Sequence, residues 1–231
     1  MLLATPCHAQ FNTDRLMTSG KSALHYEDYV LSIQYFSQII ILKPYLYEPY
    51  QMRSIAKFYL DDYSGAESDA TEAIKLNPYV PEIFDLRGIS RIRQKNYSDA
   101  IKDYDKALTL SPGNQNYWYN RAICHIENKD YDIAHAQLDT IISKWRKMSG
   151  AYNAKAEIYI LKKDTAQAAA WLDKSLGIDP YNADTWATRA NISLARKDWA
   201  SADTLLSKAL HLKPRTVQNY INRALARVNI N

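Results

Sequence analysis

The sequence is poor in glycine, cysteine and long apolar runs, and each shortage excludes a class of protein. Its 231 residues include only 6 glycines and 2 cysteines. Two cysteines cannot build a disulfide framework or a cysteine-rich zinc module. Neither of the phosphate-binding motifs GxGxxG and GxxxxGK occurs, and no apolar run approaches the ~20 residues that a membrane-spanning helix needs. The sequence therefore argues against a nucleotide-binding enzyme and against a transmembrane segment.

The chain is instead rich in hydrophobic and aromatic residues, and its charge is nearly balanced. Hydrophobic residues make up 47% of the sequence, and 18 residues are tyrosines. This hydrophobic content is too high for a disordered chain. The net charge is only +4, which is modest for a protein that binds nucleic acid through its phosphates. We therefore expect a folded protein with no nucleic-acid partner.

A repeat of 34 residues runs through almost the whole chain. One column consists of prolines, with Arg146 in the place of one member: Pro44, Pro78, Pro112, Pro180 and Pro214. A second column consists of small residues: Gly20, Ser54, Gly88, Ala122, Ala156, Ala190 and Ala224. A third column is aromatic: Tyr29, Tyr63, Tyr97, Tyr131 and Trp199. Independent columns with one period indicate a repeat architecture in which each unit is one supersecondary element.

Each unit has the pattern of two amphipathic helices separated by a short polar turn. In the third unit the sequence predicts helices over 82–94 and 97–110. On the second of these, Tyr97, Ala100 and Tyr104 fall at 3- and 4-residue spacings and so share one face. A proline closes most units, because proline cannot continue a helix. One helix pair buries too little surface to fold alone, so stacked units must share a core.

These columns resemble the signature of the tetratricopeptide repeat family. The family pattern W-x2-L-G-x2-Y, followed by A, F, A and P, is matched best by Phe84, Gly88, Ala100, Tyr104, Ala107 and Pro112. The resemblance implies an all-α fold, an α-solenoid of antiparallel helix pairs wound into a right-handed superhelix. It also implies a non-catalytic scaffold for protein–protein interaction that needs no cofactor.

Numbering each unit so that the proline column is position 32 divides the chain into six repeats and two ends. The repeats span 13–46, 47–80, 81–114, 115–148, 149–182 and 183–216. Residues 217–231 are then the first helix of a truncated seventh repeat, and residues 1–12 are a residual signal peptide or a disordered leader. Small residues at Cys7 and Ala9 fit cleavage before Gln10, although the charged start of a signal peptide is missing. This end of the chain predicts a periplasmic or secreted protein, with a cytoplasmic one as the alternative.

The family resemblance implies that the first helix of each unit lines a concave groove. Positions 2, 5, 9, 12 and 13 of each unit then face a ligand, and position 9 forms an aliphatic stripe beside acidic positions. The candidate binding residues are Gln51, Ile55, Asp85, Ile89, Tyr119, Ile123, Asn153, Glu157 and Asn191. This mixture suits a protein or peptide partner with apolar anchors and some basic character. The residues at position 12 are expected to close the helix packing instead.

A column of cations at position 7 has two interpretations. Its members are Arg53, Arg87, Arg121, Lys155, Arg189 and Arg223. They could form a ladder that binds a polyanion, or they could pair with aspartates on the second helix, such as Asp69 and Asp103. We favour the structural interpretation, because position 7 adjoins the small-residue column that faces the partner helix.

No catalytic or metal-binding constellation stands out in the sequence. The five histidines form neither an HExxH motif nor a close cluster with cysteine. Cys124 and His125 are adjacent on one predicted helix, where neighbouring side chains do not face each other. We predict neither an enzyme nor a metalloprotein.

The predicted C-terminal helix has no second helix of its own repeat to pack against. Its outer face, including Ala226 and Ile230, is expected to be exposed unless additional chain or a second molecule covers it. We therefore expect association through this uncapped helix. The alternative function is that of a regulatory or assembly segment of a longer protein whose effector domain is missing from this chain.

Overall fold

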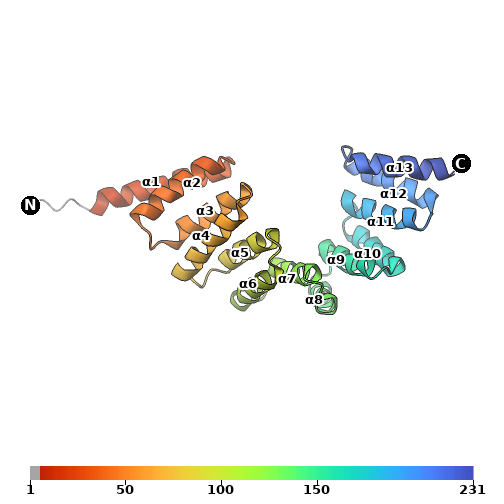
Figure 1. Ribbon diagram of the computed structural model, residues 1–231, viewed down its shortest axis with the longest axis horizontal. Coiled ribbons are helices and arrows are strands. Elements are labelled where there is room, and N and C mark those ends of the chain that lie inside the picture. The colour runs from red at the N-terminus through yellow and green to blue at the C-terminus, as the bar shows by residue number, and fades with distance from the viewer. Residues whose placement is uncertain (1–5, 231) are drawn as a thin grey trace, which may run out of the picture. The chain divides into compact units, whose positions relative to one another are not determined.

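The computed structural model describes residues 6–230, and it describes side chains from residue 13 onward. Over that range the chain forms α-helices and no strand (Figure 1), which confirms the expected all-α fold. The helices are α1 (Pro6–His25), α2 (Tyr29–Leu42), α3 (Tyr47–Tyr59), α4 (Tyr63–Leu76), α5 (Pro81–Arg93), α6 (Tyr97–Leu110), α7 (Gln115–Glu127), α8 (Tyr131–Lys144), α9 (Ser149–Leu161), α10 (Thr165–Ile178), α11 (Ala183–Ala195), α12 (Trp199–Leu212) and α13 (Val217–Ile230). The two helices predicted in the third repeat are found within one residue of their expected bounds.

The expected leader, residues 1–12, lies largely outside the described part of the structure. Residues 1–5 lie outside the described residues, and so do the side chains of residues 6–12. Helix α1 begins at Pro6, so the backbone of residues 6–12 is helical. Cleavage before Gln10 stays a prediction.

The helices fall into two compact units, each of which contains several repeats. The first contains α1–α7 and ends at residue 128, and the second begins at residue 129 and contains α8–α13. Within each unit every helix packs against the one before it in the sequence. The boundary lies between α7 and α8, which the 34-residue period assigns to one repeat, 115–148. Each unit is therefore described by itself.

The turn between the two helices of a repeat recurs as regularly as the helices do. Position 15 has a left-handed backbone although it is never glycine, with φ between 60° and 67° at Glu27, Asp61, Lys95, Lys129, Lys163 and Lys197. At position 16 an acidic or amide side chain accepts the backbone N–H three residues further on and so caps the second helix: Asp28, Asp62, Asn96, Asp164 and Asp198. A left-handed residue followed by such a cap reverses the chain within three residues and stabilises the start of the second helix.

The two helices of a hairpin approach each other through a matched pair of residues at positions 8 and 24. A Cβ atom placed on Gly88 would lie 3.0 Å from Cζ of Tyr104. The missing side chain at position 88 therefore makes room for a large ring, and Tyr104 is fully buried. In the fifth repeat the same pair is Ala156 and Leu172, which lie in one buried cluster. A larger residue on one helix is thus matched by a smaller one on the other, as close packing requires.

Stacking of successive hairpins supplies the core that a single hairpin lacks. In the first unit a buried cluster joins α5, α6 and α7, and consists of Phe84, Ala100, Tyr104, Ala107, Leu108, Tyr117 and Cys124. In the second unit a buried cluster joins α9, α10 and α11, and consists of Ala156, Ala168, Ala169, Leu172 and Ile192. Each cluster takes residues from two successive repeats, so packing between repeats stabilises both.

In the fifth and sixth repeats the aromatic residue at position 4 donates a side-chain hydrogen bond to the turn that joins its repeat to the preceding one. Nε1 of Trp186 donates a hydrogen bond to the carbonyl of Pro180, at 2.8 Å. The hydroxyl of Tyr152 donates to the carbonyl of Arg146, at 3.1 Å. Arg146 stands at the place of the missing proline, and because the acceptor is a backbone carbonyl, the link survives the loss of the proline side chain.

Helix α13 corrects one expectation about the C-terminal end. Ala226 was expected to be exposed, but it is fully buried, because with Asn219 it faces the helices before α13. The exposed apolar residues of α13 follow another stripe and are Val217, Tyr220, Ile221, Leu225, Val228 and Ile230. Ala224 lies in that stripe and is exposed, whereas the corresponding small residue is buried in the six preceding repeats.

Candidate functional site

Six of the nine candidate groove residues lie in the first unit, on the first helices of three successive repeats. Gln51 and Ile55 are on α3, and Asp85 and Ile89 are on α5; Tyr119 and Ile123 are on α7. All six side chains are half-buried, and α3 and α5 contact each other directly. Position 9 therefore presents one partly exposed isoleucine on each of the three helices.

The expectation that position 12 closes the helix packing fits only part of that column, because Ile160 is exposed. Ile126 is buried, and Ile92 packs against the buried cluster around Tyr104. These two side chains close the helix packing. Ile89 also contacts that cluster, so its side chain is anchored on one side while part of it stays accessible to a ligand.

Asp85 is a half-buried carboxylate held between two helices. Asn120 on α7 donates a hydrogen bond to Oδ1 of Asp85, at 3.4 Å. Burial raises the pKa of Asp85, and the hydrogen-bonding groups of Tyr104 and Asn120 beside it offset only part of this effect. The Tyr104 hydroxyl is buried and makes no hydrogen bond of ordinary geometry. The charged form of Asp85 is therefore under-compensated in this unit.

Negative charge continues along the same turn of α5. Glu82 is exposed, three residues before Asp85. Burial raises the pKa of the neighbouring Tyr117 to about 12, and the charges of Glu82 and Asp85 contribute to that rise. The first turn of α5 is thus an acidic edge beside the half-buried isoleucines.

The remaining three candidate residues lie in the second unit, and two of them make contacts between first helices. Nδ2 of Asn153 on α9 donates to Oγ1 of Thr185 on α11, at 2.8 Å. Asn191 on α11 accepts a hydrogen bond from Nδ2 of Asn222 on α13, at 3.0 Å. Glu157 is exposed. Asn153 and Asn191, like Asp85, therefore connect one repeat to the next in addition to any part they play in binding.

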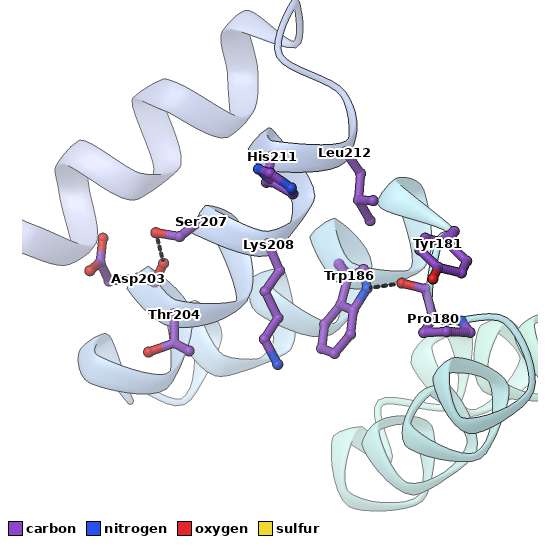
Figure 2. A pocket seen from close by; sticks show the side chains of 9 residues that line it. All are labelled: Pro180, Tyr181, Trp186, Asp203, Thr204, Ser207, Lys208, His211 and Leu212. Carbon is purple, nitrogen blue, oxygen red and sulfur yellow. Dashed lines mark hydrogen bonds between the residues drawn. The ribbon is translucent and has the colours of Figure 1, made fainter.

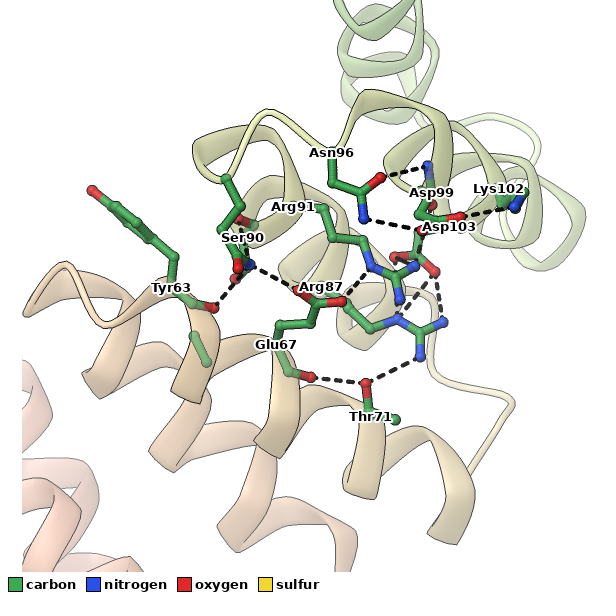
Figure 3. A network of polar contacts seen from close by, with 12 residues as sticks. Tyr63, Glu67, Thr71, Arg87, Ser90, Arg91, Asn96, Asp99, Lys102 and Asp103 are labelled. Carbon is green, nitrogen blue, oxygen red and sulfur yellow. Dashed lines mark hydrogen bonds and ion pairs between the residues drawn. The ribbon is translucent and has the colours of Figure 1, made fainter.

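Five of the six cations at position 7 form ion pairs within the fold, and Arg223 lies over the ring of Tyr220. Figure 3 shows Arg87 and Arg91 converging on the buried carboxylate of Asp103. Nη2 of Arg87 lies 2.6 Å from Oδ1 of Asp103, and its Nη1 lies 3.3 Å from Oγ1 of Thr71 in the preceding repeat. Arg91 also pairs with Glu67 of the preceding repeat, at 2.8 Å. The favoured structural interpretation of this column thus describes Arg87 correctly.

The column as a whole, Arg87 included, shows a second pairing that the sequence did not predict. Five of its members reach back 16 residues to position 25 of the preceding repeat, and their partners there are Ser37, Thr71, Asp105, Asp139 and Asp173. Arg53 and Arg87 also hold the aspartate at position 23 of their own repeat. The main role of position 7 is therefore to join neighbouring repeats.

The adjacent Cys124 and His125 do not form a reactive pair. Cys124 is a fully buried free cysteine, and burial raises the pKa of its thiol to about 12. A thiol with that pKa is protonated at neutral pH and is a poor nucleophile. Among the residues whose side chains are described, no group of three or more histidine, cysteine, aspartate or glutamate residues could hold a metal ion.

Comparison with known protein families identifies the class of this chain. Three family models, each described as a tetratricopeptide repeat, match residues 52–115, 91–158 and 149–182. Together they run without a break from residue 52 to residue 182, which is more than half of the chain. The chain belongs to the tetratricopeptide repeat family, whose members are generally non-catalytic scaffolds that bind protein partners. No curated protein matches the sequence.

Solved structures agree with this assignment at the level of the fold. The crystal structure of PilW, a widely conserved type IV pilus biogenesis factor, is similar with a TM-score of 0.75 and 17% identity, over 94% of this chain and 99% of PilW. A tetratricopeptide repeat protein from Parabacteroides merdae ATCC 43184 is similar with a TM-score of 0.72 and 19% identity, over 99% of this chain and 86% of that protein. YrrB, a tetratricopeptide repeat protein with an unusual peptide-binding site, has a TM-score of 0.56 and 15% identity, over 84% and 97%.

No helix within residues 6–230 is long and apolar enough to cross a membrane.

Proposed function

We propose that this chain is a non-catalytic scaffold that binds a peptide or a partner helix across the first helices of its first unit. The anchors are Ile55, Ile89 and Ile123, with Tyr119 beside them. The observation that supports this proposal is that the three isoleucines stand at one register of three successive helices, and that they and Tyr119 are all half-buried. A helix laid across such a surface buries its apolar face against spaced apolar anchors.

The acidic edge of α5 gives the proposed partner a basic character. Glu82 is exposed, and Asp85 is a carboxylate whose charge is disfavoured by burial. A lysine or arginine of the partner placed beside Asp85 would compensate that charge, and a charge-assisted hydrogen bond is stronger than a neutral one. The expected partner therefore alternates apolar residues with at least one cation.

The test is a selection of peptides from a phage-displayed library on the full chain, followed by affinity measurements on variants. Peptides rich in apolar and basic residues should be enriched. Their affinity for Ile89→Asp should fall at least about tenfold, which corresponds to ~1.4 kcal/mol of binding free energy. Ile41→Asp is the matched control, because Ile41 on α2 is an exposed isoleucine outside the proposed surface. Equal binding by folded Ile89→Asp and wild type would contradict the groove assignment.

A second candidate function, that of an assembly segment, is favoured by the exposed stripe on α13. Ala224 is exposed, whereas the small residue at the same position is buried in the six preceding repeats, and Leu225 beside it is half exposed. We propose that a second copy of the chain covers this stripe. Light scattering should then show a larger mass that depends on concentration, and Leu225→Glu should abolish it. A monomer at all concentrations would exclude self-assembly through α13.

The proposed location is the periplasm or the exterior of the cell. The proposal is supported by the small residues before Gln10 in the sequence. Expression of the natural gene followed by mass spectrometry of the mature protein tests it. A mature chain that begins at Gln10 would support export, and an intact Met1 in the cytoplasm would refute it.

A further inference from the structure

An open cavity of about 600 Å³ lies in the second unit, between the α10–α11 turn, α11 and α12 (Figure 2). This volume is in the range of cavities that hold small ligands. Pro180, Trp186 and Leu212 supply apolar surface, and Lys208 and His211 supply nitrogen atoms. The cavity includes none of the nine candidate groove residues, and most of its lining comes from the second helix of the sixth repeat.

The apolar wall of the cavity is held in a fixed orientation. The hydrogen bond from Nε1 of Trp186 to the Pro180 carbonyl, at 2.8 Å, sets the plane of the indole ring (Figure 2). Next to it, Tyr181 exposes 80% of its surface at the mouth of the cavity. An apolar side chain that enters the cavity therefore meets a prearranged aromatic surface, which reduces the cost of ordering the site.

The charge in the cavity is positive and lacks a counter-ion. Nζ of Lys208 lies 4.4 Å from the centroid of the Trp186 ring, and among the described residues no carboxylate pairs with it. His211 follows one helical turn later on the same face of α12. The one carboxylate in the lining belongs to Asp203, and it is paired with Arg227 at 2.7 Å.

The residue that precedes Lys208 on α12 adds no negative charge to the cavity. Position 25 is an aspartate in the third, fourth and fifth repeats, at Asp105, Asp139 and Asp173, and each of these carboxylates faces a cation of the next repeat. The sixth repeat has Ser207 at this position, and Ser207 lines the cavity. Ser207 is neutral, as Ser37 and Thr71 are at the same position of the first two repeats, so Lys208 has no carboxylate next to it in the sequence.

We propose that this cavity binds the free carboxyl terminus of a peptide whose last residue is aliphatic or aromatic. A C-terminal residue carries its side chain and its carboxylate on one Cα atom, so both groups can reach adjoining walls of one cavity. The side chain packs against Trp186 and Leu212. The carboxylate accepts hydrogen bonds from Lys208 and His211, and these are charge-assisted. This site is independent of the groove in the first unit.

The probe is a fluorescein-labelled peptide Gly-Ser-Gly-Ser-Leu-Phe with a free C-terminus, titrated with the full chain and followed by fluorescence anisotropy. The same peptide with a C-terminal amide is the second probe, and an amidated peptide with aspartate before the last residue is the third. The free acid should bind at least tenfold more tightly than both amidated peptides. If the third probe bound as tightly as the free acid, the proposal would be overturned, because the site would then recognise an acidic side chain and not a C-terminal carboxylate.

Variants locate the binding. Lys208→Ala should weaken binding of the free acid at least tenfold without changing binding of the amide. Lys106→Ala is the matched control, because Lys106 stands at the same register in the third repeat, is exposed, and lies next to Asp105. Ile89→Asp should leave the affinity unchanged, which separates this site from the groove. Absence of binding at 1 mM protein, or equal losses for Lys208→Ala and Lys106→Ala, would overturn the proposal.

Discussion

The guanidinium of Arg87 and the carboxylate of Asp103 form a bidentate ion pair inside the third repeat, with Nη2 and Oδ1 separated by 2.6 Å and Nε 3.1 Å from both oxygens. Asp103 is almost fully buried. Replacing Arg87 with alanine leaves that carboxylate with Arg91 as its remaining cation. We expect Arg87→Ala to lower the free energy of unfolding by about 2 kcal/mol, since a buried charge loses part of its compensation.

Arg121→Ala is the control for that measurement. Arg121 occupies the same register, but its partner Asp105 is more than half exposed, so water solvates the carboxylate that is left behind. The expected loss is about 1 kcal/mol or less. Urea unfolding of both variants, monitored by circular dichroism, makes the comparison. Equal losses would show that burial of the acid does not decide the effect, and an unchanged Arg87→Ala would restore the ligand-binding interpretation of the column.

Asp85 predicts an unusual dependence of stability on pH. Its pKa is raised in the folded protein, so the folded state holds the proton more tightly than the unfolded state. The ionised carboxylate therefore costs stability at neutral pH, and this cost disappears as the pH falls through the folded pKa toward about 4. We expect Asp85→Asn to melt at a higher temperature than wild type at pH 7, and the difference to shrink with acidification.

The matched control for Asp85 has the opposite sign. The ammonium of Lys102 and the amide of Asn96 lower the pKa of Asp99, so ionisation of Asp99 stabilises the folded state. Asp99→Asn should therefore lose stability at pH 7, and this loss should vanish as the pH falls below the ordinary pKa of aspartate. Melting curves between pH 3 and pH 8 would show the two trends. A parallel response of both variants would contradict the assigned environments.

The close packing at Gly88 predicts that the substitution Gly88→Ala destabilises the fold, although several other repeats carry alanine at the same position. A Cβ at Gly88 would lie 3.0 Å from the ring of Tyr104, and that ring is fully buried, so a shift would press it against its other neighbours. We expect a net destabilisation of about 1 kcal/mol for Gly88→Ala, the cost of overpacking less the gain in helix propensity. At Gly177 a Cβ would meet nothing within 4 Å. Gly177→Ala should therefore raise the melting temperature, and a rise for both variants would refute the packing argument.

Each hairpin turn contains a non-glycine residue with a left-handed backbone. We expect glycine at such a position to stabilise the fold. Lys95 has φ of 61°, a conformation that costs a non-glycine residue roughly 1 kcal/mol. Lys95→Gly should raise the free energy of unfolding by about 0.5 kcal/mol, because part of the relief is offset by the entropy of glycine. Lys106→Gly, in the middle of α6, should instead lower it by roughly 0.7 kcal/mol. Chemical denaturation of both variants provides the measurement, and equal signs would contradict the prediction.

The periodic columns predicted the helices well because each helix pair is a local structure. The proline, small-residue and aromatic columns all lie within 34 residues, and α6 was found at the bounds expected from Tyr97 and its neighbours. The left-handed residues at position 15 and the cap residues at position 16 have the same period. From the sequence they could be interpreted only as polar residues that interrupt the apolar pattern. Without glycine at position 15, the composition gave no sign of the backbone conformation.

The site was less predictable because its contacts cross from one repeat to the next. The hydrogen bond between Asp85 and Asn120 joins residues 35 apart, and the one between Asn153 and Thr185 joins residues 32 apart. The period fixes the register within a repeat but not the lateral offset between repeats. The cavity beside Trp186 was missed for a related reason, because it depends on Ser207 and on three elements that meet only in the folded unit.

The matched sizes at positions 8 and 24 also bear on how the chain avoids misfolding. Neighbouring repeats of similar sequence can exchange helices during folding, which is a characteristic failure of repeat proteins. The ring of Phe36 needs the space at Gly20, where a Cβ would lie 2.7 Å from its Cε1 atom. The same ring opposite Ser54 or Ala190 would meet a side chain. Steric exclusion therefore bars α2 from pairing with a first helix that carries serine or alanine at position 8. It cannot distinguish the fourth, fifth and sixth repeats from one another, because all three pair an alanine with a leucine.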